Sequence, residues 1–71
     1  MIRTSIDTAT LRKIIKKSGY KTEYLAKMLE IRRSSFNRKV AGGTEFRIGE
    51  ILRLCSLLEI DKPTREKIFH I

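Results

Sequence analysis

The segment KTEYLAKMLEIRRSSFNRKVAGG, residues 21–43, decides the fold of this chain. Leu25, Met28 and Leu29 follow the i, i+3, i+4 spacing of an amphipathic helix, which we expect to begin near Thr22. No alternation of period two appears in this segment or elsewhere, which argues against β-strands. The first half of the segment is therefore predicted to be a short helix with one buried side.

A second helix is predicted from Phe36 and Val40, an i, i+4 pair that gives it a single apolar side. The Gly-Gly pair that follows is expected to end it, because glycine adopts left-handed backbone conformations at little steric cost. Only residues 30–32 separate the two helices, and helices joined so tightly usually cross at a steep angle. We predict a helix-turn-helix over about residues 22–41, with its second helix at about 33–41.

The rest of the surface of helix 33–41 is rich in hydrogen-bond donors. At about 100° per residue, most of its polar side chains point away from the apolar side, while Lys39 lies nearer the edge. Arginine can bond guanine through two donors, asparagine can bond adenine through two groups, and serine adapts to several partners. The side chains predicted to contact base edges are Arg33, Ser34, Asn37 and Arg38.

The charge distribution indicates an acidic partner. Residues 11–39 hold ten Lys or Arg and two acidic residues, whereas the remainder holds six of each, so this block carries the whole net charge of +8. A basic domain can meet nucleic acid, an anionic membrane or an acidic protein. Three cations at the edge of helix 33–41 or near its ends are predicted to contact phosphates: Arg32, Lys39 and Arg47. The cations nearer the N-terminus are interpreted as solvated surface residues: Arg12, Lys13, Lys16 and Lys17.

Three further helices are expected around the helix-turn-helix. The first ends at Gly19 and is capped by Asp7 or Thr8. Its apolar residues are Leu11, Ile14 and Ile15. A short last helix starts near residues 61–63, where proline suits the first turn, and runs to about Phe69.

The helix at about residues 48–58 has the clearest apolar stripe. The stripe consists of Ile48, Ile51, Leu52, Cys55 and Leu58, and it is widened by Leu54 and Leu57. So much apolar surface indicates packing on several sides, and we expect the core to depend on Phe36 and Leu52. The predicted fold class is all-α: a compact bundle of about five short helices in a single domain over residues 1–71.

Several classes of function lack the residues they need. The only histidine, His70, is far in sequence from the Ser34–Ser35 pair. The chain therefore has no general base with a second residue to orient it beside a nucleophile, and we predict no catalytic residues and no enzyme activity. One histidine and one cysteine do not make a metal site. Cys55 is expected to fill space in a reduced, cytoplasmic protein. No apolar run approaches the length of a membrane span, and we expect no cofactor and no small-molecule ligand.

Over roughly residues 9–60 the sequence resembles the lambdoid-phage Cro and repressor family of helix-turn-helix proteins. The resemblance rests on the segment quoted above and on EFRIGEILRLCSLLEI, residues 45–60. Leu25–Ala26 match the family's Leu-Ala pair, whose small residue lets the recognition helix approach closely. Ile31 matches the apolar residue of the turn, and Gly42 matches the glycine at the family's Asn-Gly end.

The resemblance implies that helix 33–41 enters the major groove of double-stranded DNA, where the four donors named above contact bases or lie beside them. It also places Thr22 where the family's second helix meets a phosphate, and Lys27 joins the predicted phosphate contacts. Three residues depart from the family's pattern, at a glycine position in the turn and at two capping positions: Glu30, Arg32 and Lys21.

Two hypotheses from different classes follow. The first is a sequence-specific regulator of transcription, of phage or prophage type, that binds a pseudo-palindromic operator as a homodimer. The second is a protein-interaction module, such as an antitoxin or a phage accessory factor, whose basic face meets an acidic partner. The dimer interface is predicted in the apolar C-terminus: Ile68, Phe69 and Ile71. The alternative is that this tail covers the core of its own protomer.

Overall fold

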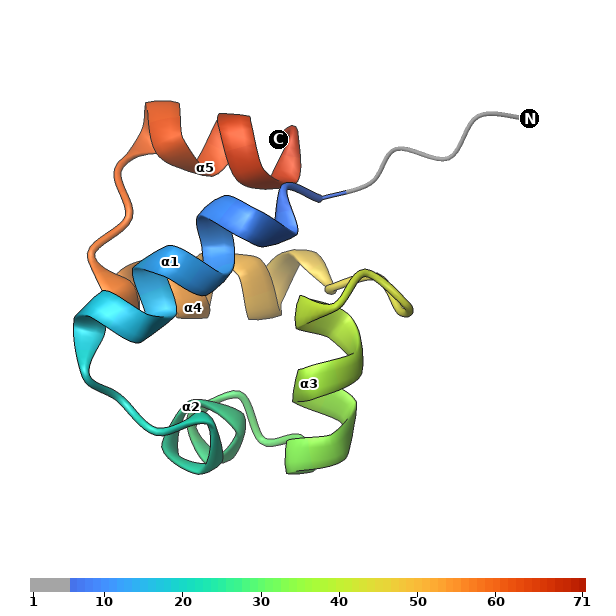
Figure 1. The fold of residues 1–71 in the computed structure, drawn as a ribbon. Helices are drawn as coiled ribbons and strands as arrows, with labels where there is room; N and C mark the ends of the chain where they lie inside the picture. The colour runs from blue at the N-terminus through green and yellow to red at the C-terminus, as the bar shows by residue number, and fades with distance from the viewer. Residues whose placement is uncertain (1–5) are drawn as a thin grey trace.

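The computed structural model describes residues 6–71, and these residues form five α-helices (Figure 1). The helices are α1 (Thr8–Ser18), α2 (Thr22–Met28), α3 (Arg33–Val40), α4 (Ile48–Leu58) and α5 (Lys62–Phe69). No strand occurs among the residues that the structure describes. The predicted all-α bundle is therefore confirmed, and each expected helix is found close to its predicted place.

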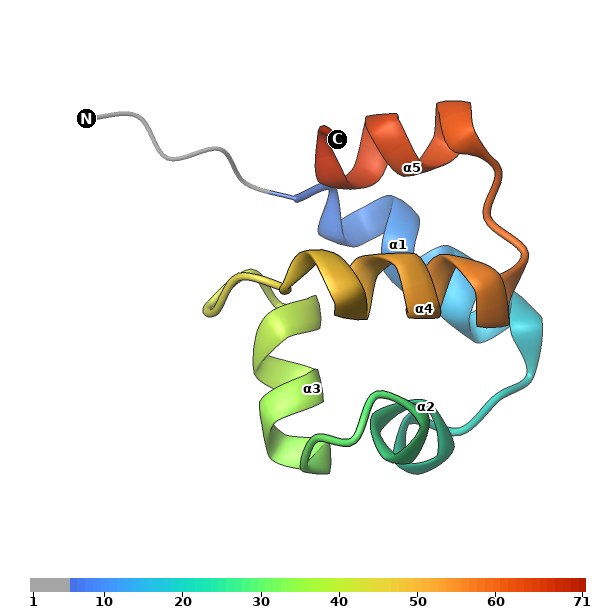
Figure 2. The same ribbon diagram turned by 180° about the vertical axis from the view of Figure 1, so that it is seen from behind.

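The helices are arranged around α1. This helix packs against α4 on one side and α5 on another, and it also contacts α3. The helices α2 and α3 pack against each other and form the end of the molecule that is lowest in Figures 1 and 2. The helix-turn-helix is thus a distinct end of the bundle, held to the other three helices mainly through α1.

Short polar side chains and a glycine set the helix ends. The carboxylate of Asp7 accepts hydrogen bonds from the backbone N–H of Thr10 at 3.1 Å and from its hydroxyl at 2.7 Å. Asp61 caps α5 in the same way, through the N–H of Thr64 at 3.1 Å. These bonds lower the pKa of both aspartates, because they stabilise the charged carboxylate. Gly19 ends α1 with a φ of 79°, as the sequence predicts.

The core draws on every helix. Its fully buried side chains are Leu11, Leu25, Phe36, Leu54 and Ile68. The prediction for Leu52 is wrong, since its side chain is 48% exposed and Ile48, one turn earlier, is more exposed still. The apolar stripe of α4 extends around too much of the helix to be buried entirely. Only the part that faces α1 is inside: Ile51, Leu54, Cys55 and Leu58.

The C-terminal helix belongs to the core of its own protomer. Ile68 is 0% exposed and Phe69 is 5% exposed. The carbonyl of Ile68 accepts the N–H of Asp7 at 2.9 Å, and the Phe69 ring meets Phe46 edge-on with centroids 5.5 Å apart. The predicted dimer interface is therefore corrected for Ile68 and Phe69, because neither has surface left to bury against a second copy. Ile71 alone of the three is exposed.

We expect the free energy of unfolding to depend on Phe36 and hardly on Leu52. Phe36→Ala removes a fully buried ring and leaves a cavity, which costs about 3 kcal/mol or more. Leu52→Ala removes a half-exposed side chain and should cost about 1 kcal/mol or less. Urea denaturation of both variants checks this. A larger loss for Leu52→Ala than for Phe36→Ala would contradict the placement of α4.

Candidate nucleic-acid interface

The turn between α2 and α3 depends on one strained residue. Glu30 has a φ of 60°, in the left-handed region that costs a residue with a Cβ about 1–2 kcal/mol. Two backbone hydrogen bonds hold it there: Glu30 N–H to the carbonyl of Lys27 and Ile31 N–H to the carbonyl of Ala26, both at 3.0 Å. This pattern closes the end of α2 as a Schellman motif does. The chain can then reverse within a few residues and start α3.

The recognition helix, α3, is anchored on one side only. Phe36 is fully buried and meets the ring of Phe46 edge-on, with centroids 6.3 Å apart and planes at 77°. Val40, one turn later, is also buried. All four residues predicted to contact bases are exposed on the other side of the helix: Arg33, Ser34, Asn37 and Arg38.

One of these four donors has a partner within the protein. Arg33 lies 3.8 Å from the carboxylate of Glu23 on α2, and both side chains are mostly exposed. An exposed pair at this distance contributes little stability. The guanidinium of Arg33 can therefore leave Glu23 for a better acceptor at low cost.

The predicted phosphate contacts surround α3. Arg32 and Lys27 are exposed beside the turn, Arg47 is exposed just before α4, and Thr22 at the start of α2 is half-buried. Arg32 and Lys21 precede α3 and α2 without making a side-chain cap, as their departure from the family pattern predicts. Their side chains are thus available to outside partners.

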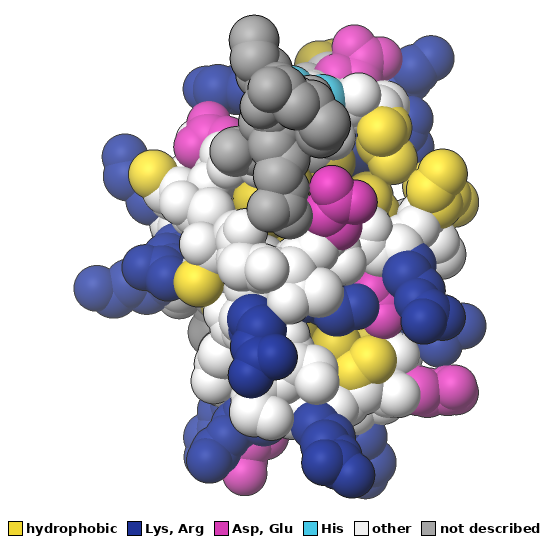
Figure 3. Space-filling model, turned by 90° about the vertical axis from the view of Figure 1, so that its right-hand side faces the viewer, with side chains coloured by type: hydrophobic (Ala, Val, Ile, Leu, Met, Phe, Trp, Pro, Cys, Tyr) yellow, Lys and Arg dark blue, Asp and Glu magenta, His cyan; other side chains and the backbone are white. Residues whose placement is uncertain are grey.

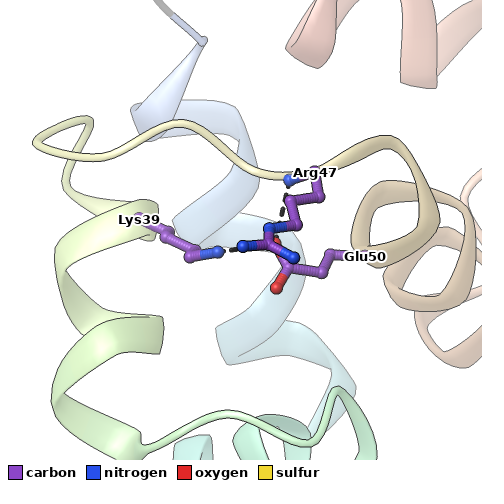
Figure 4. Close-up of polar contacts among 3 residues, drawn as sticks. All are labelled: Lys39, Arg47 and Glu50. Atoms are coloured by element: carbon purple, nitrogen blue, oxygen red, sulfur yellow. Dashed lines mark hydrogen bonds and ion pairs between the residues drawn. The ribbon is translucent and has the colours of Figure 1, made fainter.

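Lys39 has a different place from the one predicted. It is only 8% exposed, and its Nζ donates a hydrogen bond of 2.6 Å to Oε1 of Glu50 on α4 (Figure 4). The same oxygen accepts the backbone N–H of Arg47 at 2.8 Å. The phosphate role predicted for Lys39 is therefore corrected, because its ammonium is buried and bonded inside the protein.

The environment of Glu50 keeps its carboxylate charged. Burial by itself would raise the pKa of Glu50, since desolvation disfavours the anion. The hydrogen bonds from Arg47 and Lys39 and the charges of both residues outweigh this effect, so that the pKa is lowered. Glu50 is consequently the charged partner in its 2.6 Å contact with Lys39.

The structure adds two cations to the predicted nucleic-acid interface, both interpreted from the sequence as solvated surface residues. Arg12 and Lys16 of α1 line a surface hollow of about 310 Å³ together with Thr22 and Asn37. Their i, i+4 spacing beside the buried face of α1 was visible in the sequence. That this side of α1 faces α3 follows only from the packing. The other two cations of α1, Lys13 and Lys17, do not line this hollow.

The surface beside α3 is strongly basic. Figure 3 shows Lys and Arg side chains spread over one face, most of them in its lower half, while several hydrophobic side chains lie close together at its upper right. In the part of the chain that the structure describes, no helix could cross a membrane. Within the same residues, no cluster of His, Cys, Asp or Glu could hold a metal ion. The basic end is the part of the described surface best suited to an acidic polymer.

The comparisons with known proteins agree with this geometry. The sequence matches the Cro/C1-type helix-turn-helix (HTH) DNA-binding domain over residues 10–63, a range that contains all of α2, α3 and α4. Comparisons with curated proteins and with solved structures gave no significant match. The family match covers most of the chain and includes the turn, the recognition helix and the basic surface described above. The chain therefore belongs to the family of Cro/C1-type HTH DNA-binding domains, which bind DNA and are not enzymes.

Proposed function

We propose that the chain is a sequence-specific regulator of transcription, of phage or prophage type, that reads double-stranded DNA with α3 in the major groove. The observation that carries the proposal is the division of α3 into two sides. Phe36 and Val40 are buried, while four donors suited to base edges are exposed together on the outside. A helix in this position presents the donors to a groove wide enough to admit it.

The exposed cations around α3 supply the contacts to phosphates. Arg32, Lys27 and Arg47 flank the helix, and Thr22 lies at the start of α2. The hollow lined by Arg12 and Lys16 extends this set to α1. Contacts of this kind fix the register of a protein on the duplex and carry no sequence information directly.

Selection of bound duplexes from a random pool is the experiment that tests the proposal. Enrichment of one pseudo-palindromic sequence supports a regulator that binds as a symmetric pair. If no duplex is retained even at low salt, the result supports the alternative of a protein-interaction module whose basic face meets an acidic partner.

We expect Arg33 and Arg38 to carry sequence preference and Arg32 to carry general affinity. Arg33→Ala or Arg38→Ala should cost about 1–3 kcal/mol on the enriched duplex, because a bidentate contact to a base is lost, and much less on random DNA. Arg32→Ala, as the matched control, should weaken binding to the enriched duplex and binding to random DNA equally. Binding titrations on the two duplexes measure the ratio. An unchanged ratio in both Arg33→Ala and Arg38→Ala would mean that α3 is not the reading helix.

We expect the cations on the side of α1 that faces α3 to contribute more to the salt dependence of DNA binding than the other cations of α1. Removing Arg12 and Lys16 together should make the slope of log K against log salt shallower by about 1–2, since each phosphate neutralised contributes about −0.9. The control Lys13→Ala/Lys17→Ala removes the same charge from the same helix but should change the slope much less. Equal changes in the two double variants would show that the hollow beside Thr22 and Asn37 holds no phosphate.

Binding as a homodimer is part of the proposal, with an interface different from the one the sequence predicted. Three exposed apolar residues form what we call the α4 patch: Ile48, Leu52 and Ile71. Ile48 and Ile71 line one hollow of about 320 Å³, with Ile51 and Phe69 among its other lining residues. A symmetric pair has to place its two α3 helices roughly 34 Å apart to enter successive major grooves, and the protein measures 34 × 24 × 21 Å.

We expect Ile48→Gln/Leu52→Gln to weaken pairing on DNA without unfolding the chain, since both side chains are exposed. The variant should bind a half-site duplex as the wild type does but lose cooperativity on the full two-fold site. Met28→Gln, which changes an exposed apolar residue on α2, is the control. Sedimentation with both duplexes gives the stoichiometry. Undiminished cooperativity in the double variant would exclude the α4 patch as the interface.

A further inference from the structure

We propose that the buried ion pair between Lys39 and Glu50 positions the recognition helix and thereby sets the selectivity of DNA binding more than its strength. The inference rests on the proposed function. Both are positioning residues, because their side chains are nearly buried and are directed at each other. They act through the exposed donors that α3 carries on its other side.

The pair joins α3 to a helix that its backbone does not closely approach. The backbone of α3 packs mainly against α2 and α1. Its direct polar link to α4 is the 2.6 Å hydrogen bond from Nζ of Lys39 to Oε1 of Glu50 (Figure 4). The same oxygen accepts the N–H of Arg47, the residue just before α4. One carboxylate oxygen therefore connects the end of the recognition helix to the first turn of α4.

A bond at this place adds a directional restraint to the apolar packing of α3. The anchors of α3, Phe36 and Val40, lie on one side of the helix, and the hydrophobic effect that holds them has no direction. A large rotation of the helix about its axis would expose these two anchors, whereas a small rotation changes their burial little. Lys39 lies at the edge of the buried side, where a hydrogen bond of fixed length limits that rotation.

Base contacts need this restraint more than phosphate contacts do. Groups in a recognition site must be held within about 0.5 Å or 10–20° of the productive geometry. Arg33 and Arg38, on the exposed side, move with α3 when it rotates. Flexible cations that meet phosphates, such as Arg32, can adjust to a small rotation. Loss of the pair should therefore reduce selectivity and leave general affinity nearly unchanged.

A contribution to the free energy of unfolding explains the buried ion pair less well than a positioning role does. Burying two charges is costly, and apolar residues of similar size often stabilise a protein as well or better. Here Nζ of Lys39 lies 6.0 Å from the centroid of the buried Phe46 ring, so the pair is next to apolar core. A directional contact is what the ion pair supplies and an apolar pair would not.

The test removes the link while it preserves the cap of α4. Lys39→Met/Glu50→Gln leaves the net charge unchanged, and glutamine can still accept the N–H of Arg47. Lys67→Met/Glu66→Gln is the matched control, because it makes the same two substitutions, with the same charge balance, at exposed residues of α5. The measured quantity is the ratio of dissociation constants on a random duplex and on the duplex enriched from the pool.

We expect the ratio to fall about tenfold or more in Lys39→Met/Glu50→Gln, in line with the loss of one base contact, and to stay within about twofold of the wild type in the control. Lys39→Arg, which keeps the charge and the donors, should retain the wild-type ratio. The slope of log K against log salt should be the same in all four proteins. A purely structural role would lower the melting temperature and leave the ratio unchanged.

Two outcomes would overturn the inference in different ways. If the wild type prefers its enriched duplex and the folded double variant keeps the same ratio, the pair has no positioning role. If the wild type prefers no duplex, the proposed function itself fails, and this inference fails with it. Should the double variant not fold, Glu50→Asp serves instead. It keeps the charge and can cap α4, but it is one methylene too short to reach both partners, and it should lower the ratio in the same way.

Discussion

The burial of Phe36 is the interaction on which the rest of the structure depends. Its ring is the largest fully buried side chain, and it connects the recognition helix to the core through edge-on contacts from Phe36 to Phe46 and from Phe46 to Phe69. These three aromatic residues come from α3, from the loop before α4 and from α5. The C-terminal helix thus supports the helix-turn-helix from within the protomer, and this is why its apolar residues are not free for an interface.

The division of α3 into a buried and an exposed side limits its stability. Only one side of this short helix is available for the core, while the other carries cations in a chain with a net charge of +8. Like charges at this density repel one another and oppose a compact state. A small domain has little core with which to offset that repulsion. The ion pair between Lys39 and Glu50 reduces the repulsion, because it buries one cation of α3 against a carboxylate that balances its charge.

Two kinds of surface lie on different parts of the molecule. The exposed donors and cations gather around α3, whereas Ile48 and Leu52 are exposed on α4. The separation follows from the helix-turn-helix forming one end of the bundle while α1, α4 and α5 form the rest. A symmetric partner at α4 would leave the basic end accessible to a duplex. The arrangement therefore accommodates both parts of the proposed function.

The sequence by itself determined the features that depend on neighbours along the chain. Helix positions follow from apolar spacing, and the caps lie among the residues expected for them, with Asp7 and Asp61 each bonding a residue three positions later. The left-handed conformation of Glu30 fits the glycine that the family resemblance places at this position. The outward direction of the donors on α3 also follows from 100° per residue once Phe36 is inside. All these relations are local, so the order of residues suffices to predict them.

Only the tertiary structure decided the features that depend on which surfaces meet. Periodicity cannot tell which part of the wide apolar stripe of α4 faces α1, and Leu52 was therefore misplaced. Lys39 finds its partner eleven residues away, across a loop whose path no local pattern specifies. Ile68 is inside because α5 returns to α1, and Arg12 is beside Asn37 because α1 packs against α3. Each of these outcomes is set by packing between distant segments, which spacing within one helix does not encode.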